Sequence, residues 1–180
     1  MAITRITSPA ITSVSSTSIS GTLPAANIND TSISNITALP AGVGGKVLQV
    51  VHSSTSTGAS TSATTLIDTN LSGTITPSST SSKILVIVNH ADNDKNLGDC
   101  NQRIHLFRGT TFLLEFARNL NNTGDSTEQR TESGCSYLDS PSTTSATTYK
   151  TQFSKNGGSG TISVQASGCT STMTLMEIAG

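Results

Sequence analysis

The chain has 180 residues, of which 33% are hydrophobic and 12% charged, and its net charge at pH 7 is -1. Globular domains usually hold about 45–50% apolar and about 25% charged residues, so serine, threonine, asparagine and glycine replace members of both classes here. The nearly neutral charge excludes strong electrostatic attraction to nucleic acid or an anionic membrane. The length predicts one domain with an appendage.

Residues 1–45 differ from the rest and predict an extended, β-rich N-terminal anchor or stalk. Isolated aliphatic residues stand among serines and threonines at spacings that fit no amphipathic helix. The phrase Leu23-Pro24-Ala25 recurs at Leu39-Pro40-Ala41, which indicates a repeated strand–turn unit. One such chain cannot bury these aliphatic side chains alone. The expected oligomerisation or docking positions are therefore Ile3, Ile6, Ile11, Val14, Ile19, Leu23, Ile28, Ile33, Ile36 and Leu39.

Two other interpretations of residues 1–45 stay open. The composition also suits a Ser/Thr-rich tail without fixed structure, and the segment could instead fold onto its own domain. The first residues lack the apolar region of a signal peptide, and no stretch is apolar and long enough to span a bilayer. We therefore expect synthesis in the cytosol and no membrane insertion.

Residues 46–180 predict an antiparallel jelly-roll β-sandwich. The most apolar stretch, residues 83–89, is too short for a membrane span and has no polar alternation, so we expect a central strand covered on both faces. Turn-forming residues recur between short apolar segments, with a tight hairpin turn at Gly109-Thr110. Strands are expected at 46–52, 63–68, 70–76, 83–90, 101–108, 111–118, 134–138, 146–153, 161–166 and 172–178. The last of these is expected to lie inside a sheet.

Candidate chemistry is sparse. Asp92, Asp94 and Asn96 place oxygen ligands at alternate positions, which gives a weak calcium candidate. Lys95 lies among them, and Arg103 stands where a bidentate glutamate belongs, so an Asx-rich turn is the alternative. No cofactor is predicted.

The remaining polar residues predict no catalytic set. His52, His90 and His105 have no partner spacing that forms a ligand set and are expected to be surface or half-buried residues. Glu115, Glu128 and Glu132 give no buried carboxylate pair, so we expect no enzyme. The cysteines, Cys100, Cys135 and Cys169, match neither a zinc site nor a disulfide framework and are expected in the core.

The amino-acid sequence resembles those of virion fibre proteins of tailed bacteriophages, especially marine ones. The phrases that carry this resemblance are SGTLPAAN, ITALPAG, GGKVLQVV and LSGTITPSSTSSKILVIVNH. The hairpin IHLFRGTTFLLEF and the terminal MTLMEI are similar to the knob domains of such fibres, and those knobs resemble the trimeric jelly rolls of the tumour-necrosis-factor and C1q type. The spacing in residues 1–45 resembles the triple β-spiral shafts of viral fibres.

This resemblance implies a structural protein of the virion surface, made in the host cytoplasm. It implies a homotrimer that docks to other phage structural proteins through residues 1–45, while the knob meets host-surface glycans. A tail fibre or spike component and a capsid-decorating head fibre both fit. The alternative is a stand-alone carbohydrate-binding β-sandwich module. That alternative needs an aromatic platform, whereas only 3% of residues are aromatic, and Tyr137 and Tyr149 are the amphipathic rings.

Overall fold

The computed structural model describes residues 46–96, 99–121 and 128–180. The predicted stalk, residues 1–45, and its ten aliphatic docking positions lie outside the described residues. Every strand or helix assigned in the described part of the chain is a β-strand, so the predicted all-β class is confirmed. Those same residues contain no helix of the length and apolarity that a membrane crossing requires.

Ten strands follow one another along the described residues. They are β1 (Val47–Thr55), β2 (Ala59–Thr61), β3 (Ile67–Ile75), β4 (Lys83–Lys95), β5 (Asn101–Arg108), β6 (Thr111–Leu120), β7 (Gln129–Asp139), β8 (Thr147–Gly157), β9 (Ile162–Val164) and β10 (Ser171–Ile178). The two segments expected at 63–68 and 70–76 become one strand, β3, which has a register irregularity between Asp68 and Ser72. Its Asn70 has a φ of 66°, typical of an inserted bulge residue.

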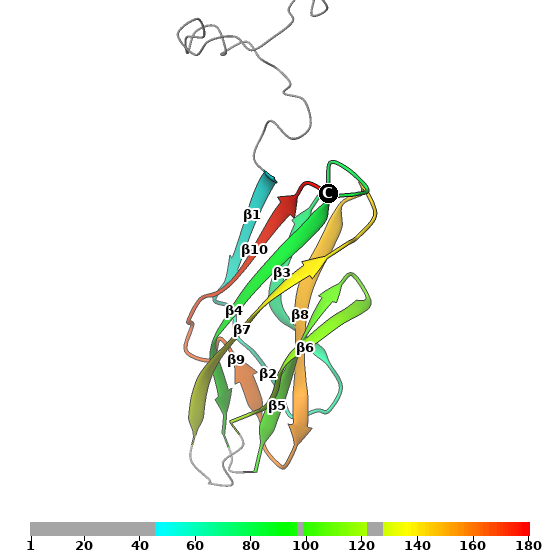
Figure 1. The fold of residues 1–180 in the computed structure, drawn as a ribbon. Coiled ribbons are helices and arrows are strands. Elements are labelled where there is room, and N and C mark those ends of the chain that lie inside the picture. Colours follow the sequence, from blue (N-terminus) through cyan, green and yellow to red (C-terminus); the bar gives the residue numbers. More distant parts are fainter. Residues whose placement is uncertain (1–45, 97–98, 122–127) are drawn as a thin grey trace, which may run out of the picture. The chain divides into compact units, whose positions relative to one another are not determined.

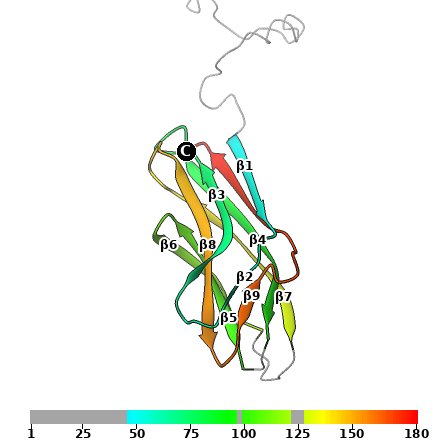
Figure 2. The same cartoon turned by 180° about the vertical axis from the view of Figure 1, so that it is seen from behind.

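The strands form the two antiparallel layers of a sandwich (Figures 1 and 2). Sheet I has the order β1-β10-β4-β9-β2, with β7 paired to β4. Sheet II has the order β3-β8-β5-β6. Most neighbours in the sheets are distant in sequence, which is the Greek-key connectivity of a jelly roll.

Strand β4 lies at the centre of sheet I, as the apolar stretch predicts. It pairs with β10 on one side and with β7 on the other. Ile84, Val86 and Val88 face the core and are at most 3% exposed, whereas Ile87 on the other face is 42% exposed. Within one chain only the inner face of sheet I is covered, by sheet II, so this chain alone does not supply the expected cover over the outer face.

The last strand, β10, is paired on both sides, between β1 and β4, as expected from its alternating apolar residues. Val47 at the start of β1 is the partner of Ile178 at the end of β10. The chain therefore enters and leaves the sandwich at the same end of sheet I (Figure 1).

Residues 92–95 belong to a strand rather than to an Asx-rich turn, whereas Asn96 follows the end of that strand. Strand β4 continues to Lys95 past a register irregularity between His90 and Asn93, where Asp92 has a φ of 54°. The buried amide nitrogen of Asn93 donates to the Ser133 hydroxyl at 3.1 Å, so this donor is paired inside the sheet. The partner strand β7 likewise begins at Gln129, before the start of the strand expected at 134–138.

Apolar side chains fill the space between the sheets in two clusters. The larger cluster holds Leu71, Ile75, Ile84, Val86, Val88, Leu106, Tyr149, Met173 and Leu175. The smaller cluster holds Cys100, Ile104, Ala117, Phe153, Ile162 and Val164. Along β8, Thr151 stands between Tyr149 of one cluster and Phe153 of the other, so a polar position separates the two apolar groups.

Candidate functional site

The outer face of sheet I carries an apolar row that crosses the sheet from edge to edge. In the strand register, Val50 of β1 is the partner of Met176 of β10, Met176 of Leu85 of β4, and Leu85 of Leu138 of β7. Side chains on one face of a sheet alternate with those on the other, so these four residues share the outer face. Val50 is 56% exposed and Leu138 52% exposed.

The rows on either side extend this surface. One contains Val47 and Ile178, and the other contains Ile87 between polar Thr174 and Ser136. We call the set the outer apolar patch; its members are Val47, Val50, Leu85, Ile87, Leu138, Met176 and Ile178. Leu48 at the adjoining bulge is 48% exposed.

The outer apolar patch is poor in charge. On this face of the four strands, from the row that contains Val47 to the row that contains Ser54, the residue with a formal charge is Lys83. It lies at the end of its row. Contiguous apolar surface of this kind on a soluble domain marks an interaction site, and interface cores are depleted of charge. Sequence inspection missed the patch because its residues come from four separate strands.

The opposite end of sheet I is polar and hollowed. An open hollow of about 880 Å³ is lined there by Asp92, Arg130 and Cys169, among others. The Arg130 guanidinium lies 2.5 Å from Glu128 and 3.4 Å from Asp92 and also donates to the Ser167 hydroxyl. The pKa of Arg130 is raised, mainly by its hydrogen bond to the Glu128 carboxylate. Burial acts in the opposite direction, and the charge of Asp92 adds to the increase.

Of the calcium candidates, Asp92 lines this hollow; Asp92 and Asn96 have protein partners, whereas the buried Oδ1 of Asp94 has no hydrogen-bond partner among the described residues. Asp92 Oδ2 accepts from the backbone N–H of Ser167 at 2.6 Å, and Asn96 Oδ1 accepts from the N–H of Thr161 at 2.7 Å. Burial, followed by the nearby Glu128 charge, raises the pKa of Asp94. Within the ranges that the structure describes, no group of three His, Cys, Asp or Glu side chains could hold a metal ion. Calcium binding at these residues stays a prediction.

The three cysteines and three histidines occupy different environments. Cys100 is buried, Cys135 is half-buried and Cys169 is exposed, so the expectation of three core cysteines is wrong for Cys169. His52 is exposed, as expected. His90 and His105 are 0% and 8% exposed, in contrast to the surface or half-buried positions expected for them.

His90 belongs to a buried polar layer between the two apolar clusters. Its Nε2 lies 2.8 Å from Thr151 Oγ1, which in turn lies 2.6 Å from Thr69 Oγ1. The Gln165 side chain, oriented so that its amide donates to the carbonyl oxygens of Thr69 and Val164, accepts from His90 Nδ1 and from the Ser171 hydroxyl. This orientation requires a proton on Nδ1, so Nε2 is free to accept from Thr151. Burial lowers the pKa of His90 to about 4, so the imidazole is neutral.

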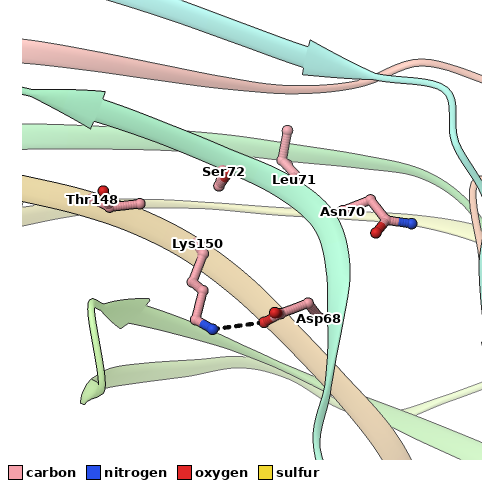
Figure 3. Close-up of a pocket in the computed structure, with 6 residues that line it drawn as sticks. All are labelled: Asp68, Asn70, Leu71, Ser72, Thr148 and Lys150. Carbon is pink, nitrogen blue, oxygen red and sulfur yellow. Dashed lines mark hydrogen bonds and ion pairs between the residues drawn. The ribbon is translucent and has the colours of Figure 1, made fainter.

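A second hollow, of about 360 Å³, lies on sheet II where β3 bends (Figure 3). Asp68 of β3 and Lys150 of β8 form an ion pair at 2.8 Å across it. Gln152 also donates to Asp68 Oδ1 at 2.8 Å. The pKa of Asp68 is lowered, mainly by the hydrogen bond from Lys150. Burial acts in the opposite direction, and the hydrogen bond from Gln152 lowers the pKa further. The Asn70 bulge brings a polar side chain to the rim of this hollow.

Neither tyrosine forms an exposed sugar platform. Tyr149 is fully buried, and its hydroxyl donates to Asp139 Oδ2 at 2.7 Å. The same oxygen accepts a hydrogen bond from Arg108 Nη1, also at 2.7 Å. Tyr137 packs against the larger apolar cluster.

No protein-family model and no curated protein matches this chain. Among solved structures, the chain is similar to that of infectious bursal virus derived T=1 particles, with 12% identity and a TM-score of 0.39, over 74% of this chain and 37% of that one. A second similar structure is the infectious bursal disease virus VP2 subviral particle, with 15% identity and a TM-score of 0.37, over 74% of this chain and 38% of that one. The chain thus spans less than two fifths of the length of these capsid proteins, and likeness at this level carries no argument about its function.

Proposed function

We propose that this chain is a structural virion protein: a homotrimeric bacteriophage fibre, either a tail fibre or spike component or a capsid-decorating head fibre. The outer apolar patch is the observation that carries this proposal. Its half-exposed aliphatic side chains favour contact with another protein surface, because removing apolar surface from water lowers the free energy. A jelly roll with no convergent catalytic groups in its described part is suited to a structural role.

A second and a third copy of the same chain are the occupants that this patch fits best. Homo-oligomer interfaces are more apolar than other interfaces, and the patch lacks the carboxylates and arginines that would select a charged partner. Charge repulsion between two copies is small, because the charged residue of this face, Lys83, lies at the end of a row rather than at the centre. Flat sheet faces already pack on one another inside this sandwich, and the same packing can continue between copies.

The fibre reading also draws on residues 1–45. Their repeated aliphatic positions predict docking to other phage structural proteins or to sister chains, and they join the sandwich at β1, which contributes Val47 and Val50 to the patch. Covalent continuity of a stalk with an apolar face is the layout expected of a fibre with a knob. Attachment to the particle or to the host surface is the corresponding role.

Light scattering on the full chain tests the proposal. We expect a mass of three chains, and we expect the double variant Val50→Ser, Leu138→Ser to fall to one chain at micromolar concentration. Phe112→Ser is the matched control, because Phe112 is 54% exposed but lies on sheet II. A monomeric parent chain would overturn the fibre proposal and favour the stand-alone carbohydrate-binding module.

A shortened chain that starts at Lys46 separates the two parts. A trimer of this chain would place the assembly in the sandwich and leave residues 1–45 as a docking arm. A trimer of the full chain together with a monomer of the shortened chain would place assembly in residues 1–45 and contradict the role assigned to the patch.

A further inference from the structure

An aromatic cluster lies on the outer face of sheet II, on the opposite layer from the outer apolar patch. Phe107 of β5 and Phe112 of β6 are cross-strand partners whose ring centroids lie 5.9 Å apart at 74°. Phe112 also meets His105 edge-on, at 5.3 Å and 73°. Phe112 is 54% exposed, so one ring of a fixed cluster is presented to solvent. Edge-to-face packing holds that ring in place.

His105 lies beneath this exposed ring with its hydrogen-bonding capacity largely unused. The residue is 8% exposed, yet neither ring nitrogen has a hydrogen bond of good geometry within the described chain. Its Nε2 lies 3.4 Å from Glu115 Oε2, which is a weak polar contact. A buried donor or acceptor without a good partner costs free energy, so a native structure that keeps one calls for an explanation such as a ligand group.

Polar side chains continue from the aromatic cluster across the same face. In the strand register, Phe107 is the partner of Lys150, and His105 is the partner of Gln152. Lys150 and Gln152 both bind Asp68, at the hollow of about 360 Å³ beside the Asn70 bulge. An exposed aromatic ring, a row of amide and charged groups, and a hollow therefore form one strip across β6, β5, β8 and β3.

The charges of the strip itself are paired with one another, and the neighbouring Arg103 on the same face of β5 donates to the Ser154 hydroxyl and the Thr64 carbonyl rather than to a carboxylate. Asp68 lies 2.8 Å from Lys150, and Glu115 lies 3.3 Å from Arg118 as well as near His105. A strip with balanced charge has no preference for an anion or a cation, but it offers donors and acceptors side by side. Adjacent hydroxyl groups on a ring, each able to donate and accept, match such a surface.

We propose that this strip is a binding site for a neutral saccharide. The apolar C–H face of one sugar ring stacks on Phe112, and the hydroxyls of that ring and the next hydrogen-bond to Gln152, Lys150 and Asp68. This inference deepens the proposed function, since it names the surface and ligand class for attachment to a host, but it does not depend on trimer formation.

The test is binding of the full chain to an array of neutral and sialylated oligosaccharides, followed by titration with the strongest neutral glycan. We expect selective binding of neutral glycans, and a loss of affinity of tenfold or more in Phe112→Ala, since removal of a central aromatic contact costs that much. Asp68→Asn should weaken binding as well. The matched control is Glu132→Ala, which shortens an exposed side chain of β7 in sheet I, outside both the strip and the outer apolar patch, and should leave affinity unchanged.

The outcomes of the array and of light scattering on the same preparations are independent. A trimer that binds no glycan of the array, or one whose binding is unaffected by Phe112→Ala, overturns the saccharide site and leaves the proposed function intact. A monomer that binds neutral glycans through Phe112 supports the site and overturns the fibre. Preference for sialylated over neutral glycans contradicts the charge argument and overturns the ligand class.

Discussion

His90 Nε2 and Thr151 Oγ1, 2.8 Å apart, join the two sheets of the sandwich through a hydrogen bond in its interior. His90 belongs to β4 of sheet I and Thr151 to β8 of sheet II. The bond lies between two apolar clusters, and its partners have 0% exposure, so water does not replace it. A buried polar contact of this kind fixes how the two sheets face each other, because any other alignment leaves both groups unpaired.

Acid should weaken the fold through His90. Its pKa is about 4 in the folded chain against 6.5 in the unfolded chain, so the unfolded chain binds more protons between these values. The contribution of neutral His90 to the free energy of unfolding is therefore fully present above pH 6.5. It is lost as the pH drops to about 4, and its size is roughly 3 kcal/mol. Urea unfolding at a series of pH values between 7 and 4 measures this loss.

Replacement of His90 identifies the source of that loss. The variant His90→Gln should be less stable at pH 7 but should lose less stability between pH 6.5 and 4. His52→Gln is the control, because His52 is exposed and hydrogen-bonds only at the surface, 3.2 Å from Thr174. An unchanged pH dependence in His90→Gln would contradict the assignment.

Glu177 should govern stability at lower pH. Burial by itself raises the pKa of this fully buried carboxylate, but hydrogen bonds from Ser78 and Gln49 outweigh burial and lower the pKa to about 2. The contribution is present above pH 4.5 and is lost as the pH falls through about 2, and its size is about 3 kcal/mol. The variant Glu177→Gln should lose on the order of 2 kcal/mol at pH 7, because donors then face an amide.

Unfolding of Glu177→Gln between pH 5 and 2.5 measures the second half of this prediction. The variant should show a flatter decline than the parent chain over that range. Glu132→Gln, an exposed carboxylate on β7, should leave the decline unchanged. A parallel decline in the parent chain and Glu177→Gln would assign the acid sensitivity to other carboxylates.

Strands with clean alternation could be predicted from the sequence, and polar residues inside the sandwich could not. Ile104 and Leu106 face inward and Phe107 faces outward, as the alternation in residues 101–108 predicts. The same reasoning placed His90 at or near the surface, because a histidine shows no partner in its own neighbourhood. Its partner Thr151 is 61 positions away, so only the paired sheets bring the two groups together.

The candidate surfaces follow the same division. The outward position of His105 and Phe107 is readable from alternation within one strand, whereas their link to Lys150 and Gln152 depends on the pairing of β5 with β8. The outer apolar patch combines four strands, and its members read one at a time as core residues. Alternation within a strand gives the face of a residue, but it does not give the neighbours in the next strand.

Two glycines with similar backbone angles should differ in their tolerance of a methyl group. Gly158 and Gly168 have φ values of 76° and 74°, in the left-handed region that costs an alanine about 1–2 kcal/mol. A Cβ on Gly168 meets no atom within 4 Å, whereas a Cβ on Gly158 would lie 1.9 Å from the carbonyl oxygen of Asp99. Gly158→Ala should therefore be the more destabilising, by a further 2 kcal/mol or so.

Thermal unfolding of both variants measures this difference, and the conformational cost cancels because the two φ values match. Equal destabilisation of Gly158→Ala and Gly168→Ala would mean that the backbone near Asp99 moves aside without cost.

The three thiols should react with a disulfide reagent at very different rates. Cys169 is exposed and should react within the first phase, at one thiol per chain. Burial raises the pKa of Cys135 to about 11 and also raises the pKa of Cys100, so both lack the thiolate that attacks the reagent. Their modification should require opening of the sandwich and should follow the rate of unfolding in urea. Cys169→Ser should remove the fast phase and leave the slow one, while Cys135→Ser should leave the fast phase intact. A fast phase that survives Cys169→Ser would show that Cys100 or Cys135 becomes accessible without global unfolding.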